Sequence, residues 1–253
     1  LYYNYRDISQ KGTEVRTGTQ YTPDGSPNLS DLTFLPKAGF TGSVQIGYEG
    51  TDSRGKTFRG QIRIRVNQGS GSRYFQDMGS YAWAAPYVDL LYEAGVITGT
   101  GGQRYRPADA VSRGDFMLML YRAFQLTPAS GAGFPDVPPG SYYAQAIQAA
   151  RAAGIASGYP DGGFHPQEPV TRQDAMVLLE RTMQATGWSL GAANTGYLSG
   201  FRDGGMVAPY AQEAMSHMIE YGIITGTPEQ KLNPIQSISR AEMAVMLARA
   251  ITF

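Results

Sequence analysis

Hydrophobic and polar positions follow two different periods in the two parts of this chain. In residues 1–67 they alternate one by one, most clearly at 58–66, where apolar side chains take turns with Arg and Gln. Because successive side chains of a strand point to opposite faces, this pattern predicts a half-buried antiparallel strand. Residues 44–48 predict a second strand, and 32–35 and 18–21 predict two weaker ones. We therefore expect a small β-sandwich-like module over residues 1–67.

After a polar linker at 68–72, the apolar positions recur every three or four residues. This part is a threefold internal repeat, which we place at residues 73–130, 131–190 and 191–253. Each copy contains a Phe-x-Asp opening, a Gly-x-x-x-Gly pentapeptide and a Ser/Thr-Arg-x-Asp/Glu motif. The pentapeptide's first glycine and the arginine are 18 residues apart in every copy, so one structural unit is used three times. The motifs begin at Phe75, Gly95 and Ser112, at Phe134, Gly154 and Thr171, and at Phe201, Gly222 and Ser239.

Each copy predicts two helices. The first has an apolar stripe, such as Tyr87, Leu90 and Leu91, and ends at the pentapeptide glycine, which suits a left-handed closing residue. The second begins at the Ser/Thr, which forms a capping box with the acidic residue three positions later. One unit is too small to close a good core alone. We therefore expect the second helices to form a central three-helix bundle in an all-α pseudo-threefold body with grooves between units.

The arginine of the third motif is not explained by capping. Arg113, Arg172 and Arg240 take the first helical position, where the positive end of the helix dipole disfavours a cation. Two explanations stay open. Each arginine could pair with an aspartate of a neighbouring unit (Asp77, Asp136 or Asp203). Alternatively, the guanidinium and the free amides of the helix start could together bind an acidic group of a ligand.

The three motifs together resemble the S-layer homology domain family, in which three tandem copies are usual; the match covers residues 73–253. The resemblance implies a three-lobed body that holds a surface protein to the cell wall. It also implies a ligand, secondary cell-wall polysaccharide bearing pyruvate ketals on N-acetylmannosamine, with peptidoglycan as a further candidate. Ahead of it, the stretch from Gly39 to Gly60 resembles the last strands of bacterial immunoglobulin-like or cadherin-like surface modules.

Carried onto this sequence, the resemblance implies one set of ligand contacts in each copy. The aromatic residue would stack on a sugar, and the aspartate would accept hydrogen bonds from sugar hydroxyls. The sets are Asp77, Trp83, Thr98, Gly99 and Arg113; Asp136, Tyr143, Ser157, Gly158 and Arg172; and Asp203, Tyr210, Thr225, Gly226 and Arg240. The copies differ at several of these positions, so we expect the grooves to be unequal.

Composition removes several classes of function. The chain has 253 residues, with 21 Lys and Arg against 21 Asp and Glu, so a basic nucleic-acid-binding character is absent. It has no Cys and only two His, which excludes disulfide scaffolds, thiolate chemistry and multi-histidine metal sites. No apolar run approaches the length of a membrane helix. The chain opens without Met or a signal peptide, so we interpret it as a processed piece of a longer protein.

No catalytic motif of a hydrolase, kinase or dinucleotide-binding enzyme is present. We expect no enzymatic activity, cofactor or metal, and an extracellular location in the cell wall or S-layer of a Gram-positive bacterium. Two alternatives remain: a self-assembly module of a protein lattice, and the attachment tail of an extracellular enzyme. His165 is expected at the surface, His217 within a helix, and Asp161 in a turn and not in a calcium site.

Overall fold

The computed structural model describes most of the repeat region and short parts of the N-terminal region. The described residues are 2–3, 13–14, 32–34, 42–51, 54–66, 71–131 and 133–252. The strand expected at 18–21 lies outside them, as do residues 68–70 of the expected linker.

The N-terminal region contains two small antiparallel sheets. Strands β1 (Tyr2–Tyr3), β2 (Thr13–Glu14) and β3 (Leu32–Thr33) form one, in the order β2-β1-β3. Strands β4 (Gly42–Thr51) and β5 (Thr57–Val66) form a hairpin. The three strands expected at 32–35, 44–48 and 58–66 are thus confirmed as strands.

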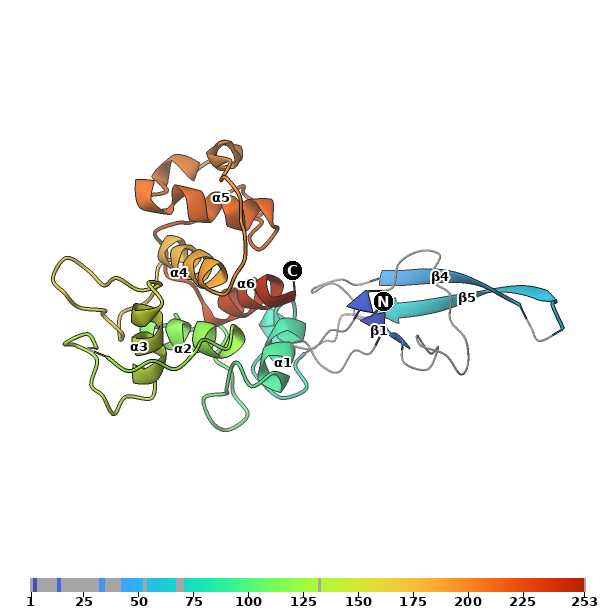
Figure 1. Ribbon diagram of the computed structural model, residues 1–253, viewed down its shortest axis with the longest axis horizontal. Helices are drawn as coiled ribbons and strands as arrows, with labels where there is room; N and C mark the ends of the chain where they lie inside the picture. Colours follow the sequence, from blue (N-terminus) through green and yellow to red (C-terminus); the bar gives the residue numbers. More distant parts are fainter. Residues whose placement is uncertain are drawn as a thin grey trace.

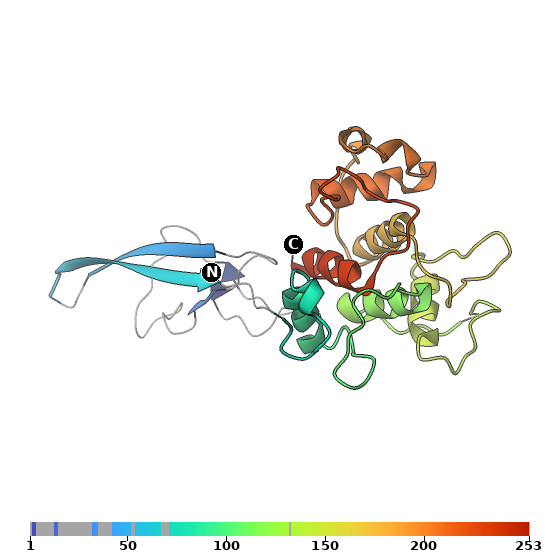
Figure 2. The same cartoon turned by 180° about the vertical axis from the view of Figure 1, so that it is seen from behind.

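The expected β-sandwich is not confirmed. In the hairpin, Val44 and Ile46 of β4 pair with Ile64 and Ile62 of β5, which places these apolar residues on one face. That face is at most half-buried among the described residues, and Ile62 is exposed. In Figures 1 and 2 the hairpin extends away from the helices.

Each repeat contains the two predicted helices. The first helices are α1 (Ala85–Glu93), α3 (Ala144–Ala152) and α5 (Gln212–Glu220), and the second are α2 (Arg113–Ala123), α4 (Arg172–Ala185) and α6 (Arg240–Thr252). Short 3-10 turns precede α1 and α5: η2 (Gly79–Tyr81), η3 (Thr195–Gly200), η4 (Gly204–Met206) and η5 (Pro209–Ala211). Within the described ranges, none of the helices is long and apolar enough to span a membrane.

The second helices lie at the centre and the first helices at the periphery (Figure 1). Helix α2 contacts both α4 and α6, and each second helix packs against the first helix of the following repeat. The contacts run α2 to α3, α4 to α5 and α6 back to α1, so the three repeats close into a ring. Helix α6 is buried on nearly all sides, as expected of a helix inside a core.

Backbone hydrogen bonds close the same ring at its centre. Just before each second helix, the amide of Val111 donates to Ile238 O, that of Ile238 to Val170 O, and that of Val170 to Val111 O. The three bonds are 3.0, 3.1 and 2.9 Å long. The pseudo-threefold arrangement is therefore built into the main chain at the point from which the second helices start.

The two glycines of each pentapeptide have different structural roles. Gly95 closes α1 with a φ of +68°, the left-handed conformation that a side chain disfavours. Gly99 lies against the ring of Phe75, where a Cβ atom would come within 2.6 Å of it. The Phe-x-Asp opening and the pentapeptide, far apart in sequence, are thus one packing unit.

Candidate binding site at the repeat junctions

The capping boxes form only in part. The hydroxyls of Ser112, Thr171 and Ser239 accept the amides three residues later, at 3.1, 3.2 and 3.2 Å. The return bond to the cap amide is present only in repeat 3, where Glu242 accepts from Ser239 N at 2.9 Å. Asp115 has one methylene group fewer and accepts instead from the Ser112 hydroxyl.

The free amides expected at the helix starts are already occupied, so that expectation is wrong. The amides of Arg113 and Gly114 donate to the carbonyls of Glu168 and Pro166, both at 2.9 Å, in the loop of repeat 2. The same two bonds join α4 to the loop of repeat 3 and α6 to the loop of repeat 1. Each helix N-terminus therefore holds the next repeat and has no amide left for an anion.

The guanidinium groups of Arg113 and Arg240 also reach into the next repeat. Arg113 Nε donates to Phe164 O at 3.1 Å, and Arg240 Nε donates to Tyr105 O at 2.7 Å. Each guanidinium lies over the ring of the residue that accepts its bond, at 4.9 and 4.5 Å from the ring centre. The two arginines are only 7% and 9% exposed. They act as clamps between repeats.

Arg172 occupies the same helical position in a different environment. Its partner is Glu242, with Nη1 3.2 Å from Oε1, and its Nε is buried without a hydrogen bond to any described residue. Repeat 3 has Leu232 where Tyr105 and Phe164 stand in the other repeats, so no ring is available there. Burial lowers the pKa of Arg172, and Glu242 offsets part of that effect.

The three aspartates of the Phe-x-Asp motifs do not pair with these arginines, so that alternative is also wrong. Asp77 accepts the amides of Tyr105 and Arg106 at 2.9 and 2.8 Å. Asp136 and Asp203 make the same two bonds in their own repeats. In the described repeat region, none of the three motif arginines lies within ion-pair distance of any of these aspartates. Partial burial alone would raise the pKa of Asp77, but the amide bonds outweigh it and lower that pKa.

These aspartates hold the loops that meet the helix starts. The second amide donor in each repeat has a left-handed φ, +56° at Arg106, +59° at His165 and +52° at Asn233. Such a conformation persists only where surrounding bonds fix it. The aspartates therefore fix the loop geometry, a structural role that the sequence did not predict.

The exposed aromatic position is one residue away from the prediction in repeat 2. Tyr143 is only 4% exposed, whereas Tyr142 is 68% exposed. Trp83, Tyr142 and Tyr210 all stand 12 residues before the first pentapeptide glycine, a spacing that would have identified Tyr142. Tyr143 packs instead on Gly114, where a Cβ atom would come within 3.0 Å of its ring. This contact explains the glycine in the arginine motif of repeat 1.

The exposed tyrosines contact the acidic residue of the previous repeat's capping box. Tyr142 donates to Asp115 and Tyr210 to Asp174, both at 2.7 Å. Partial burial and the bond to Asp115 raise the pKa of Tyr142 to about 12. Trp83, at the corresponding place in repeat 1, has no hydroxyl group that could donate to Glu242. Oε1 of Glu242 instead accepts a hydrogen bond from Arg172.

The structure assembles the predicted contacts across repeats and not within them. Thr98 accepts through its carbonyl from Arg240 Nη2 at 3.1 Å, so the arginine of repeat 3 faces the pentapeptide of repeat 1. Ser157 and Thr225 have exposed side chains at the equivalent places. Gly158 and Gly226, like Gly99, lie against phenylalanine rings. The arginine of each set therefore contacts a different repeat from its own.

Part of each clamp stays open. Neither Nη atom of Arg113 bonds to a described residue, and neither is sealed from solvent. Arg240 has the same open position at Nη1. A guanidinium that is held through Nε and has an Nη atom without a partner can donate hydrogen bonds to a carboxylate from solution.

The histidines are used in other ways. His165 lies between two carboxylates, with Nε2 2.7 Å from Asp161 and Nδ1 2.8 Å from Glu168. Asp161 also accepts the amide of Gly163, so it forms a turn as expected. His217 is buried on α5 beside Glu180 of α4. Among the described residues, no cluster of acidic and histidine side chains could hold a metal ion.

Comparison with known proteins identifies the three tandem copies. The model of the S-layer homology domain matches residues 74–117, 133–176 and 200–244. An endoglucanase of Bacillus sp. (strain KSM-635) is 28% identical over 69% of this chain and 18% of its own length. The surface-layer 125 kDa protein of Lysinibacillus sphaericus is 29% identical over 70% and 14%. An amylopullulanase of Thermoanaerobacterium thermosulfurigenes is 29% identical over 65% and 9%. The chain thus spans less than a fifth of these relatives.

Proposed function

The chain belongs to the S-layer homology domain family, and we propose that it anchors a bacterial surface protein by binding an anionic, pyruvylated cell-wall polysaccharide at its repeat junctions. Domains of this family are non-catalytic modules that attach proteins to the cell wall. The surface-layer relatives likewise indicate a location at the cell surface. The activity of the parent protein lies outside this module.

One observation supports the ligand assignment above all others. Arg113 is held through Nε with both Nη atoms open, and Arg240 is held through Nε and Nη2 with Nη1 open. A pyruvate ketal carries a carboxylate whose two oxygens match such a guanidinium edge. Because the protein has already fixed the side chain, little conformational entropy is lost when the anion binds. This chemistry needs no free helix amides.

The exposed aromatic residues supply the second element of the proposed site. Tyr142 and Tyr210 lie beside helix starts, where their bonds to Asp115 and Asp174 orient them, and Trp83 is the exposed aromatic residue at the equivalent position of repeat 1. An aromatic face stacks on the apolar face of a pyranose ring. We assign the carboxylate of the sugar to the arginine and its ring to the aromatic side chain.

The junctions are not equivalent in this proposal. Glu242 occupies Nη1 of Arg172 and adds a negative charge that repels an incoming carboxylate. Arg113 and Arg240 have no such carboxylate partner among the described residues. We therefore assign anion binding to the junctions of Arg113 and Arg240, with the Arg172 junction weak.

Calorimetry with purified polysaccharide, native and chemically depyruvylated, tests the proposal. Arg113→Lys and Arg240→Lys keep the charge but remove the two-pronged donor, and each should weaken native polysaccharide binding about tenfold. Arg172→Lys is the matched control and should change it little. Equal affinity of the wild type for the two polysaccharides would contradict the carboxylate assignment.

Two kinds of parent protein use such a module among the relatives, polysaccharide-degrading enzymes and surface-layer proteins. An attachment tail of an enzyme and a lattice component both remain compatible with the anchoring proposed here. The upstream coding sequence separates the first from the second. Ultracentrifugation tests lattice assembly, which requires concentration-dependent association without polysaccharide.

A further inference from the structure

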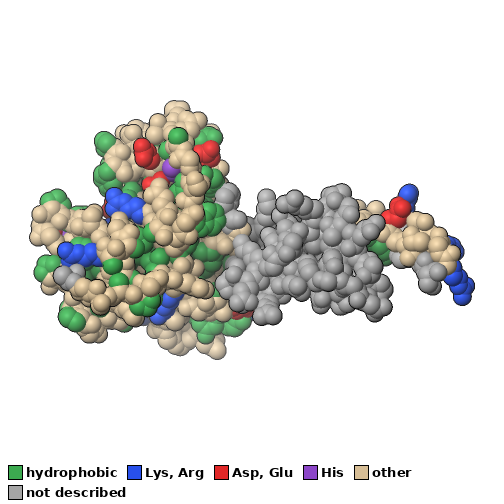
Figure 3. All heavy atoms as spheres, viewed as in Figure 1, with side chains coloured by type: hydrophobic (Ala, Val, Ile, Leu, Met, Phe, Trp, Pro, Cys, Tyr) green, Lys and Arg blue, Asp and Glu red, His purple; other side chains and the backbone are tan. Residues whose placement is uncertain are grey.

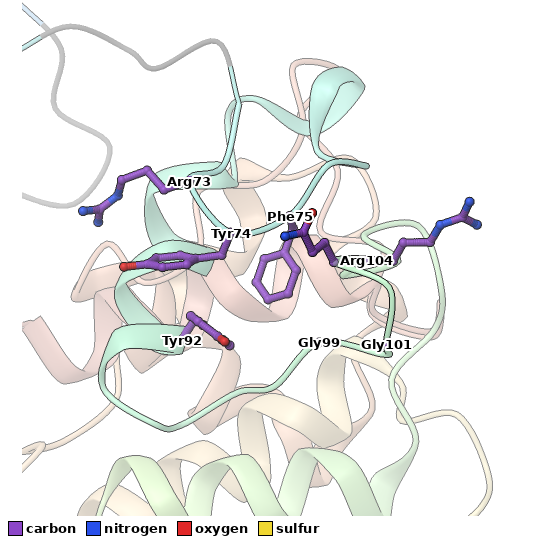
Figure 4. Close-up of a pocket in the computed structure, with 8 residues that line it drawn as sticks. Arg73, Tyr74, Phe75, Tyr92, Gly99, Gly101 and Arg104 are labelled. Atoms are coloured by element: carbon purple, nitrogen blue, oxygen red, sulfur yellow. The ribbon is translucent and has the colours of Figure 1, made fainter.

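Repeat 1 has a pocket on the side of its pentapeptide loop away from Arg240. The pocket has a volume of about 360 Å³, and its walls include Tyr74, Phe75, Tyr92, Gly99 and Gln103 (Figure 4). Gly99 follows Thr98, whose carbonyl accepts from Arg240, and Tyr105 contacts Arg240 on one side and Phe75 on the other. The pocket and the junction therefore lie on opposite sides of one loop.

Aromatic rings form much of the wall of this pocket, and two arginines also line it. The Tyr74 and Tyr92 ring centres are 4.7 Å apart and tilted, and the Phe75 ring meets Tyr92 edge-on at 5.1 Å. Arg73 and Arg104 stand at its two ends (Figure 4), and the Arg73 guanidinium lies 5.5 Å from the centre of the Tyr74 ring. Arg73 is paired with Glu93, which also accepts from the Tyr74 hydroxyl at 2.8 Å.

The other two repeats show that the fold does not require this aromatic pocket. Repeats 2 and 3 have Gly133 and Gly200 at the position of Tyr74. At the position of Tyr92 they have Arg151 and Ile219. In repeat 2 the Arg151 guanidinium lies 4.4 Å over the Phe134 ring and donates to Gly133 O at 2.5 Å. A charged side chain thus packs there on the phenylalanine, whereas in repeat 1 the equally buried Phe75 packs against Tyr92.

We propose that this pocket binds a second pyranose unit of the same polysaccharide whose acidic unit occupies the junction. The inference rests on the proposed anchoring function. An exposed tyrosine ring offers a stacking face to the apolar side of a sugar. Gln103 carries a side-chain amide at the rim, held by Gln76 Nε2 at 2.5 Å, that can bond to sugar hydroxyls. Since Arg73 is already paired with Glu93, we assign recognition of the sugar to stacking on the tyrosine rings.

Tyr92→Arg is the direct test because it installs the residue that repeat 2 uses at this place. The new arginine can lie over Phe75 as Arg151 lies over Phe134, so the fold should be kept. Tyr197→Arg is the matched control, since Tyr197 and Tyr92 are both 39% exposed. Tyr74→Gly, again the residue of repeats 2 and 3, removes the other wall. Calorimetry is run with native and depyruvylated polysaccharide, and thermal unfolding checks each variant.

Tyr92→Arg and Tyr74→Gly should each weaken binding of both polysaccharides about tenfold, while Tyr197→Arg binds as the wild type does. Arg240→Lys, in contrast, should affect only the native polysaccharide. If Tyr92→Arg and Tyr74→Gly both bind as the wild type does, the pocket is not a sugar site and junction binding stands. If pyruvyl groups make no difference but the tyrosine variants lose affinity, the junction chemistry fails and the pocket stands.

Discussion

The junction between repeats 2 and 3 differs from the other two, although all three use the same motif. Arg113 and Arg240 each donate to a carbonyl and lie over an aromatic ring of the next repeat. Arg172 meets Leu232 where the other two arginines meet an aromatic ring. Its Nε has no hydrogen-bond partner among the described residues, and its Nη1 pairs with Glu242. The role of the arginine is therefore set by the loop it meets and not by its own motif.

The same junction has a contact that the others lack. His217 of α5 is buried beside Glu180 of α4, with Nδ1 2.5 Å from Oε1. The corresponding pairs elsewhere are Tyr121 with Ala149 and Ala248 with Leu90. A buried polar pair thus joins repeats 2 and 3 where the arginine clamp is weakest. The following predictions test that difference, from the largest effect to the smallest.

Glu180→Ala should produce the largest loss of stability, about 2–4 kcal/mol, because it leaves a buried imidazole without its partner. Glu180→Gln keeps a hydrogen-bonding group at the same place and should cost less. Chemical denaturation measures both variants. Equal stability of Glu180→Ala and the wild type would mean that the pair does not hold this junction together.

Arg113→Ala and Arg240→Ala should each cost about 2–3 kcal/mol, since each loses a charged hydrogen bond and a contact with a ring. Arg172→Ala should cost about 1 kcal/mol, because its Nε has no bond to lose. The free energy of unfolding in urea gives the comparison. An equal cost for all three variants would show that the clamp does not depend on the neighbouring loop.

Gly114→Ala should cost about 1–2 kcal/mol, because the new Cβ atom approaches the Tyr143 ring and the Pro166 carbonyl, each at 3.0 Å. In a Tyr143→Ala background the same substitution should cost less, since junction 3/1 already pairs Ala241 with Ala84 at these positions. A double-mutant cycle measures the coupling. Additive effects of the two substitutions would mean that Gly114 and Tyr143 are not energetically coupled.

His165 should show the smallest and most local effect. Hydrogen bonds that its ring donates to the carboxylates of Glu168 and Asp161 raise its pKa above the ordinary 6.5. The stabilisation is therefore complete below the unfolded-state pKa and is lost as pH rises through the raised value. NMR titration of the ring protons should give the raised pKa, and Glu168→Gln should lower it. A titration unchanged by Glu168→Gln would mean that the carboxylate does not hold the ring in solution.

The sequence predicted the repeats, the helix pairs and their central bundle, because these depend on local periods and on motifs of constant spacing. It did not predict that Arg113 meets repeat 2 while Arg240 meets repeat 1. That pairing depends on the order in which the repeats close, and the motifs do not encode it. Asp77 was assigned to a ligand or a neighbouring arginine. The sequence alone does not distinguish a carboxylate that accepts backbone amides from one that binds a ligand or an arginine.

The remaining errors have equally local causes. Tyr143 was selected over Tyr142 although the 12-residue spacing identifies Tyr142. The N-terminal sandwich was expected from alternation, which reports that a strand has two unlike faces but not that a second sheet covers one of them. The hairpin β4–β5 has two unlike faces of this kind and extends away from the helices. In the view of Figure 3, charged side chains of both signs are scattered over the helical body.

The account depends most on a carboxylate reaching the open Nη atoms of the arginine clamps. NMR of the arginine side-chain nitrogens, during titration with native polysaccharide, tests this directly. The signals of Arg113 and Arg240 should shift at Nη while that of Arg172 stays in place, and depyruvylated polysaccharide should leave all three unchanged. Binding that shifts none of the three guanidinium signals would contradict the proposed chemistry.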